Sequence, residues 1–317
     1  MTTSLAMTEN EVAAIRDGCG LVDRSERGKL ALTGAQAKEF LAGQVTNDVE
    51  GLEPGTGCYA AFLTHKGKMQ GDLRVLDLGD ELWLDTERGA LQALFDMIRR
   101  FKIGFDVELH KRTLECGLLS LIGPGARAVA AAQELPVAEH SSMRARRGGA
   151  DVVIVATFAG VDLICAAQDV EAVRAWLAEQ GAVPISEAAA DVVRVEAGRP
   201  RFGIDIDDTT IPQEAGLNER AVSFTKGCYV GQETVARLFY KGKPNRHLRG
   251  LRLEGPAATG DVLRAGEREV GRVGTVVESP QLGPIALAMV RREAEPGAEV
   301  EVGDGARATV VELPFRG

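Results

Sequence analysis

The feature that most constrains the fold of this chain is an internal repeat ahead of residue 190. Residues 28–41 alternate apolar and polar side chains as far as Gly34 and then change to helical spacing, and residues 117–130 do the same around Gly123. Each copy therefore predicts a strand, a glycine turn and a helix. After the first copy come two alternating runs in residues 71–86, a helical run at 90–101 and a strand-like run at 105–110. After the second copy the same order recurs, at residues 151–167, 170–180 and 182–186.

This repeated order predicts two related α+β subdomains, each an antiparallel sheet with helices on one face. We place them at approximately residues 1–115 and 116–240, within a core that spans residues 1–240. The two subdomains could be consecutive or interleaved. Chance similarity between short α/β segments is the alternative interpretation.

The pattern changes near Leu248. From there the chain consists of short β-type runs separated by Gly and Pro, with no helical period. Such runs are typical of a small β-barrel or sandwich, which we place at residues 245–317. Residues 241–244, with two lysines, a glycine and a proline, look like the linker into it.

Composition excludes several classes of protein. The 317 residues include 37 Lys and Arg against 46 Asp and Glu, a formal net charge of -9, which argues against a generic nucleic-acid coat protein. No apolar run approaches the ~20 residues of a membrane span, and the N-terminus lacks the apolar core of a secretion signal. The five cysteines include no CxxC pair, so we expect a reduced, cytoplasmic protein with no membrane partner. No phosphate loop or dinucleotide fingerprint is present, which argues against ATP, GTP or NAD.

The least regular stretch, residues 194–249, contains the octapeptide KGCYVGQE at 226–233. Long irregular stretches in a compact protein are usually functional loops when they carry aliphatic and aromatic residues, as this one does. A lysine two positions away and a following helix N-terminus both stabilise a thiolate, so Cys228, with Lys226, is a candidate nucleophile, redox group or soft-metal ligand. A buried structural cysteine is the alternative.

A run of six cations without an acidic residue lies between Glu233 and Glu254. In an acidic protein such a patch attracts anions, unless it is simply a solvated face. Its members are Arg237, Lys241, Lys243, Arg246, Arg249 and Arg252.

The octapeptide, together with RVEAGRPRFGIDI at 194–206 and IPQEAGL at 211–217, resembles the YgfZ family of folate-binding proteins of iron-sulfur cluster assembly and repair. Residues 21–75 and 270–290 resemble the wider superfamily of aminomethyltransferases and glycine-cleavage T-proteins, so the likeness covers nearly the whole chain. The resemblance implies a T-protein-like ring of three domains around a tetrahydrofolate pocket. It also implies tetrahydrofolate, or a one-carbon derivative, as the cofactor.

The resemblance also suggests site residues. A pterin presents an N–H and an amino group side by side, which a carboxylate accepts bidentately, and Glu196 is the first candidate for that carboxylate and Glu214 the second. The alternative for Glu196 is a surface partner of a nearby arginine. Where the T-protein pattern has two adjacent acids this chain has Gly71 and Asp72, so only Asp72 remains as a catalytic acid.

Five further residues complete the candidate cofactor-binding set. Asn47 and Asp48 are expected at the pocket edge, although both residue types also cap turns. The others are Tyr229, Gln232 and Arg237.

The function that follows is a tetrahydrofolate-binding accessory factor for iron-sulfur cluster assembly or repair that uses Cys228. Its partners would be folate and iron-sulfur client or assembly proteins. One alternative is a folate-dependent aminomethyltransferase or other one-carbon transferase. Another is a folate-binding scaffold linked to tRNA modification. In that case the cationic run, which is otherwise expected to bind the acidic tail of the folate, would contact tRNA. The four histidines are isolated, so we expect no resident metal site.

Overall fold

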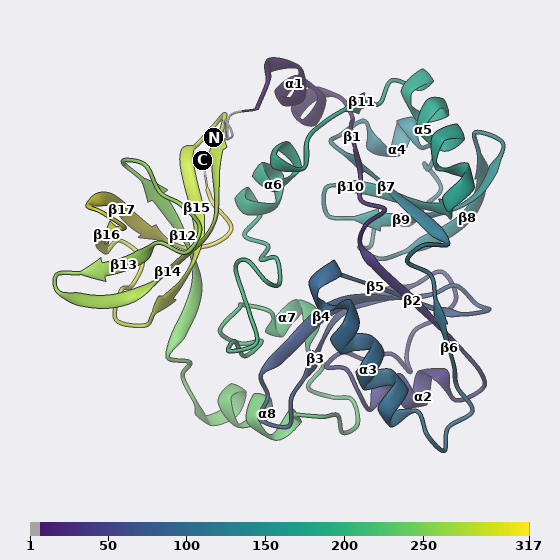
Figure 1. Ribbon diagram of the computed structural model, residues 1–317, viewed down its shortest axis with the longest axis horizontal. Helices are drawn as coiled ribbons and strands as arrows, with labels where there is room; N and C mark the ends of the chain where they lie inside the picture. Colours follow the sequence, from purple (N-terminus) through teal and green to yellow (C-terminus); the bar gives the residue numbers. More distant parts are fainter. Residues whose placement is uncertain (1–6, 317) are drawn as a thin grey trace.

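The computed structural model describes residues 7–316 and consists of three lobes, two α+β subdomains and a β-barrel (Figure 1). The lobes are arranged as a ring around a central segment that contains α6 (Glu187–Glu196). This architecture confirms the predicted α+β class with two antiparallel-sheet subdomains and a C-terminal barrel.

The first subdomain is a five-stranded antiparallel sheet in the order β3-β4-β5-β2-β6. Helix α3 has apolar residues at helical spacing, and it buries Leu94 and Ile98 in the core cluster that the sheet forms. The elements of this subdomain are β2 (Gly28–Thr33), α2 (Ala37–Ala42), β3 (Gly57–Leu63), β4 (Met69–Asp77), β5 (Leu82–Thr86), α3 (Leu91–Phe101) and β6 (Glu108–Lys111).

The second subdomain is a six-stranded sheet in the order β11-β1-β7-β10-β9-β8, antiparallel except for the parallel pair of β1 and β11 at one edge. Helix α5 buries Val173 and Leu177 in its core cluster. The elements are β1 (Gly20–Asp23), β7 (Cys116–Ile122), α4 (Ala126–Val129), β8 (Ser142–Arg147), β9 (Ala150–Thr157), β10 (Gly160–Ala166), α5 (Val170–Glu179) and β11 (Val183–Pro184).

The two sheets repeat one topology. Strands β2, β5, β4 and β3 are hydrogen-bonded in the same succession as β7, β10, β9 and β8. They differ at the other edge, where β6 pairs directly with β2, whereas β1 is inserted between β7 and β11. Because β1 precedes the whole first sheet in the chain, the two subdomains are interleaved there.

A glycine ends the first strand of each repeat because the chain turns there with φ positive. Gly34 has φ 108° and Gly123 has φ 123°. A Cβ atom on Gly34 would lie 2.3 Å from the carbonyl oxygen of Asp106, and one on Gly123 would lie 2.7 Å from that of Gly18. A side chain at either position would therefore collide with backbone as well as strain the turn.

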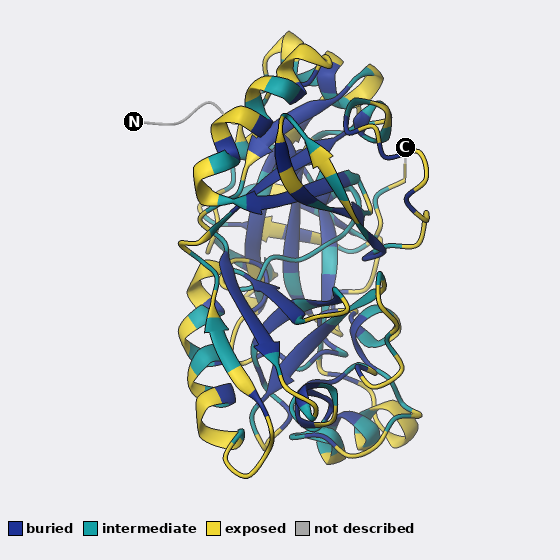
Figure 2. Cartoon of the chain, turned by 90° about the vertical axis from the view of Figure 1, so that its right-hand side faces the viewer, coloured by how far each residue is buried: buried dark blue, intermediate teal, exposed yellow. Residues whose placement is uncertain are grey.

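The two sheets contact each other through a small apolar cluster. Leu76 and Trp83 from the first sheet meet Leu118, Val155 and Ile164 from the second. Figure 2 shows the strands mostly buried, while exposed residues gather on the outer helices. The polar residues that remain between the sheets are therefore shielded from bulk water.

Six antiparallel strands close the C-terminal barrel, in the order β12-β15-β14-β13-β16-β17. Arg194 of α6 anchors it, because its guanidinium bonds both Asp205 and Thr275 at 2.7 Å. The strands are β12 (Arg246–Leu253), β13 (Val262–Ala265), β14 (Arg268–Ser279), β15 (Gly283–Arg291), β16 (Glu299–Val302) and β17 (Ala306–Val311).

Five short helices complete the described structure. Three are α-helices, α1 (Glu9–Asp17), α7 (Asn218–Ala221) and α8 (Gln232–Lys241), and two are 3-10 helices, η1 (Arg88–Ala90) and η2 (Ala167–Asp169). None of the helices in residues 7–316 combines the length and apolar character needed to cross a membrane.

Candidate functional site

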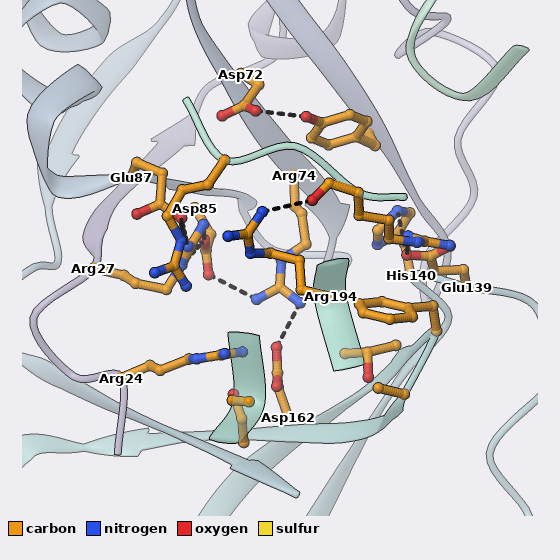
Figure 3. A pocket seen from close by; sticks show the side chains of 18 of the residues that line it. Arg24, Arg27, Asp72, Arg74, Asp85, Glu87, Glu139, His140, Asp162 and Arg194 are labelled. Carbon is orange, nitrogen blue, oxygen red and sulfur yellow. Dashed lines mark hydrogen bonds and ion pairs between the residues drawn. The ribbon is translucent and has the colours of Figure 1, made fainter. Parts of the chain in front are cut away.

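A cavity of about 160 Å³ lies where the two sheets face each other, and α6 and the segment after it form one wall. In another protein a cavity of ~150 Å³ holds one benzene molecule, so this space suits one ring-sized group of a larger ligand. Strands β3, β4, β5, β7 and β10 all contribute to the lining, which is dominated by charged side chains (Figure 3).

Arg74 of β4 joins the two sheets across this cavity. Its guanidinium bonds Asp85 of β5 at 2.7 Å and Asp162 of β10 at 2.6 Å (Figure 3). Arg27 bonds the other oxygen of Asp85 at 2.7 Å. The two guanidinium groups hold the pKa of Asp85 well below its usual range despite burial, so this carboxylate stays ionised. The network fixes the relative position of the sheets. Both of its carboxylates, Asp85 and Asp162, are paired with arginines.

Asp72 is the buried acid that this network does not pair. Its carboxylate accepts a hydrogen bond of 2.5 Å from the Tyr59 hydroxyl, and the residue is only 6% exposed. Burial raises the pKa of Asp72 to about 6, although the hydrogen bond from Tyr59 acts in the opposite direction. A carboxyl group with such a pKa can give or take a proton near neutral pH.

The neighbouring residue, Gly71, has no room for a side chain. A Cβ atom there would lie 2.6 Å from a ring carbon of Phe62 and 2.7 Å from the Cβ of Ala90. Packing in the first subdomain therefore excludes a second acid beside Asp72.

His140 and Arg220 also line the cavity, and the sequence alone did not suggest them. Burial and nearby positive charge lower the pKa of His140 to about 4, so its ring is neutral. Arg220 of α7 lies with its guanidinium 5.1 Å from the ring centre of Tyr59. Charged residues at positions of otherwise apolar strands, such as Arg74 and Asp162, were the one signal in the sequence that could have located this cavity.

The two predicted pterin acceptors do not line this cavity. Glu196, at the end of α6, accepts a hydrogen bond of 2.5 Å from the Ser279 hydroxyl of the barrel. Glu214 is 7% exposed and forms a two-pronged ion pair with Arg246, at 2.9 and 3.1 Å. The carboxylate of Glu214 is thus already engaged by an arginine, whereas that of Glu196 makes one contact through one oxygen.

Asn47 and Asp48 do not line the cavity, and both make hydrogen bonds to the backbone. The Asn47 side chain donates to the carbonyl oxygens of Tyr59 and Arg220, at 2.8 and 3.3 Å, and so fixes the backbone of two lining residues. Asp48 accepts a hydrogen bond from the Gly51 amide at 3.1 Å. Asp48 therefore caps a turn, which was the alternative to a place at the pocket edge.

The octapeptide lies away from the cavity lining. Cys228 is exposed, in contrast to the buried Cys19 and Cys165. Lys226 donates its ammonium protons to two backbone carbonyls, at 2.5 and 2.8 Å, and it lies over the Tyr229 ring. Burial lowers the pKa of Lys226 to about 8.

Within the described residues, no hydrogen bond joins Lys226 to Cys228. The predicted support of the thiolate by this lysine is therefore corrected, because the ammonium is engaged by carbonyl oxygens of residues 42 and 45 instead. Tyr229 is buried in a core cluster at 7% exposure, Gln232 begins α8, and Arg237 is exposed on that helix. None of these three residues lines the cavity.

Three of the six side chains in the cationic run are engaged by other groups of the protein. Arg246 pairs with Glu214, Arg249 pairs with Glu312 at 3.1 Å, and Arg252 donates to a backbone carbonyl. Lys241 and Lys243 are exposed. In the part of the chain that the structure describes, no group of three or more His, Cys, Asp or Glu is arranged to hold a metal ion.

Comparison with known proteins assigns the fold to a family. A model described as the GCVT N-terminal domain matches residues 2–226, and one described as the glycine cleavage T-protein C-terminal barrel domain matches residues 246–316. An aminomethyltransferase of Geobacillus thermodenitrificans (strain NG80-2) is 31% identical over 99% of this chain and 92% of its own length.

A solved structure agrees with that assignment. The glycine cleavage system aminomethyltransferase T from Bartonella henselae superposes with a TM-score of 0.86 at 26% identity, over 97% of this chain and 89% of that one. The two family models, the relative and the solved structure agree from one end of the described chain to the other. The chain therefore belongs to the glycine cleavage T-protein family.

Proposed function

We propose that this protein binds a reduced folate between its two α+β subdomains, with Asp72 as the acid that exchanges a proton with the bound ligand. The observation that carries the proposal is Asp72 itself, a buried carboxyl group with a pKa of about 6 that lines a cavity of ring size. A reduced folate supplies the amine nitrogens that carry a one-carbon unit. A group that titrates near neutral pH suits proton transfer at such a nitrogen.

Two contacts would hold the folate. The cavity takes one ring-sized group, and another part of the ligand extends from it toward the central segment. Glu196 lies in that segment and remains our candidate for the pterin acceptor, because only one of its oxygens makes a contact within the described residues. Glu214 is a weaker candidate, since binding a pterin there would require it to leave Arg246.

The binding of folate is tested by calorimetry with tetrahydrofolate on the wild type and on Glu196→Gln and Glu214→Gln. We expect the Glu196 variant to bind about ten-fold or more weakly, because one charge-assisted contact is worth about 1.5–3 kcal/mol. Glu278→Gln, a change of a carboxylate on the barrel, is the control. Absence of binding to the wild type would refute the proposal, and unchanged affinity in the Glu196 variant would refute the role of Glu196 as the pterin acceptor.

Within this framework we favour an accessory role in iron-sulfur cluster assembly or repair, as in the YgfZ family, over a standard aminomethyltransferase. Two features support that choice. Packing excludes the second acid at Gly71, and the octapeptide presents an exposed thiol at Cys228, for which aminomethyl transfer has no use. The partners would be iron-sulfur client or assembly proteins.

The two roles give different results. An aminomethyltransferase forms methylene-tetrahydrofolate from an aminomethyl donor, and Asp72→Asn abolishes that rate. An accessory factor shows no such turnover, but it accelerates recovery of an oxidatively damaged iron-sulfur enzyme. Cys228→Ser would then abolish the recovery while the control Cys116→Ser retains it. Equal recovery with Cys228→Ser and the wild type would reject the role of the thiol.

A further inference from the structure

The cavity is lined by seven arginines, and six of them have carboxylate partners. Paired guanidinium groups hold the protein together and are not available to a ligand. The pairs are Arg24 with Glu187, Arg27 with Asp85 and Glu87, Arg74 with Asp85 and Asp162, Arg194 with Asp191 and Asp205, Arg199 with Glu139, and Arg201 with Glu187.

Arg220 differs from the other six. Among residues 7–316, no carboxylate lies within 4.0 Å of its guanidinium, which also donates no hydrogen bond. The residue is half-buried. Burial and the positive charge of Arg199 lower the pKa of Arg220, although the more distant carboxylates of Glu139 and Asp72 act in the opposite direction. A half-buried charge without a partner costs stability that a bound anion would restore.

Arg220 is also held in position. Its guanidinium lies 5.1 Å from the ring centre of Tyr59, whose hydroxyl donates to Asp72. Asn47 binds the backbone carbonyls of both Tyr59 and Arg220, so the ring and the cation are tied to one side chain. The unpaired charge is therefore fixed on the same side of the cavity as the acid, which suits recognition of a ligand group near the reacting atoms.

His140 provides a second, independent observation in the same cavity. The residue is 9% exposed, and its Nδ1 atom is buried without a hydrogen-bond partner among the described residues. Buried polar atoms in native proteins nearly always have a partner, so one without a protein partner in a cavity wall points to a ligand or a water molecule in that cavity. Because the ring is neutral, it can supply one N–H to an anion without adding charge.

We propose that Arg220, with His140 beside it, is the carboxylate-binding residue of this cavity. The inference rests on the proposed function for the identity of the ring-bearing ligand. A carboxylate can come from two sources here. One is the glutamate tail of the folate, and the other is a separate small acid, such as an amino acid that donates a one-carbon unit. In both cases the carboxylate would form a charge-assisted pair with the planar guanidinium.

The test compares the wild type with Arg220→Gln, Arg220→Lys and the control Arg268→Gln, which removes a charge from an exposed barrel residue. Calorimetry measures binding of tetrahydrofolate, of 6-methyltetrahydropterin, which has no carboxylate, and of glycine and acetate in the presence of the pterin. Loss of a charge-assisted pair weakens binding roughly ten-fold to a hundred-fold. Thermal unfolding of each variant accompanies the titrations.

If the tail supplies the carboxylate, Arg220→Gln weakens tetrahydrofolate binding and leaves the pterin affinity unchanged. If a separate acid supplies it, the variant binds tetrahydrofolate normally and loses glycine or acetate binding. In both cases Arg220→Lys retains more affinity than Arg220→Gln, and the control behaves as the wild type. The unfolding temperature of Arg220→Gln should stay close to that of the wild type, because the removed charge has no ion-pair partner and loses only its contact with the Tyr59 ring.

Three results would overturn the inference. The first is equal tetrahydrofolate affinity in the wild type and Arg220→Gln with no binding of either acid to the wild type. The second is an equal loss of pterin and tetrahydrofolate affinity, which would give Arg220 a structural role. The third is a lowered unfolding temperature in Arg220→Gln with unchanged binding. Failure of both tetrahydrofolate and 6-methyltetrahydropterin to bind the wild type would refute the proposed function instead. Acetate binding to the wild type and to Arg220→Gln would then test the carboxylate-binding role of Arg220 by itself.

Discussion

Asp72 should make the stability of this protein depend on pH in a way that one substitution removes. The pKa of an aspartate rises from an ordinary 3.8 to about 6 at this site because the carboxyl group is buried. The native state therefore binds the proton more tightly than the unfolded chain does. At pH values above both pKa values, an acid with this difference costs the native state about 3 kcal/mol, from 1.36 kcal/mol for each unit of pKa.

The sign follows from the proton balance. Below an ordinary aspartate pKa both states are protonated, and Asp72 costs nothing. Between 3.8 and about 6 only the native state holds the proton, so stability falls as pH rises. Asn at this position mimics the neutral acid and still accepts the hydrogen bond from Tyr59. Asp72→Asn should therefore lie within about 0.5 kcal/mol of the wild type near pH 4 and exceed its unfolding free energy by about 3 kcal/mol near pH 7.5.

Urea unfolding of both proteins across this pH range measures the difference directly. The comparison cancels the other titrating groups, because they are common to both proteins. Tyr59→Phe is a second arm. It removes a donor to the carboxylate, so the pKa of Asp72 should rise further and the fall in stability should extend to higher pH. A difference between Asp72→Asn and the wild type that stays constant from pH 4 to 7.5 would show that Asp72 is not a neutral-range acid.

Three further outcomes are expected. Gly71→Ala should lower the unfolding free energy by about 1–3 kcal/mol in urea, because its methyl group would overlap the Phe62 ring, and an unchanged value would contradict the packing argument. A thiol reagent at neutral pH should label Cys228 before Cys19 in peptide mapping, since Cys19 is buried and its pKa is raised to about 11. Arg194→Met should cost about 3–5 kcal/mol in urea unfolding, because it leaves buried carboxylates without their partner, and a cost below 1 kcal/mol would refute that.

Local patterns were sufficient to predict most of the architecture. The strand, glycine turn and helix around Gly34 and Gly123 are present as expected, because hydrophobic periodicity and the positive φ at each glycine are properties of neighbouring residues. The short β-type runs predicted in residues 245–317 likewise form the six-stranded barrel. The insertion of β1 between β7 and β11 could not be inferred in the same way, because it depends on pairing between residues about 100 positions apart or more.

The site was much less accessible from the sequence. Asp72 could be named as an acid, but its partner Tyr59 lies on another strand and its pKa depends on burial between two sheets. The octapeptide predicted a lysine beside the thiol from their spacing alone. The structure turns Lys226 toward backbone carbonyls instead, because in an irregular segment two residues of separation do not determine which way a side chain points.

The order of elements, the duplication and the barrel were thus determined by the sequence, since each follows from side chains close together along the chain. Only the tertiary structure decided which charges are paired. Six of the cavity arginines meet carboxylates contributed in part by distant segments, and Arg220 does not. Whether a charge is satisfied depends on the distance between groups in space, and that distance exists only once the two sheets have packed together.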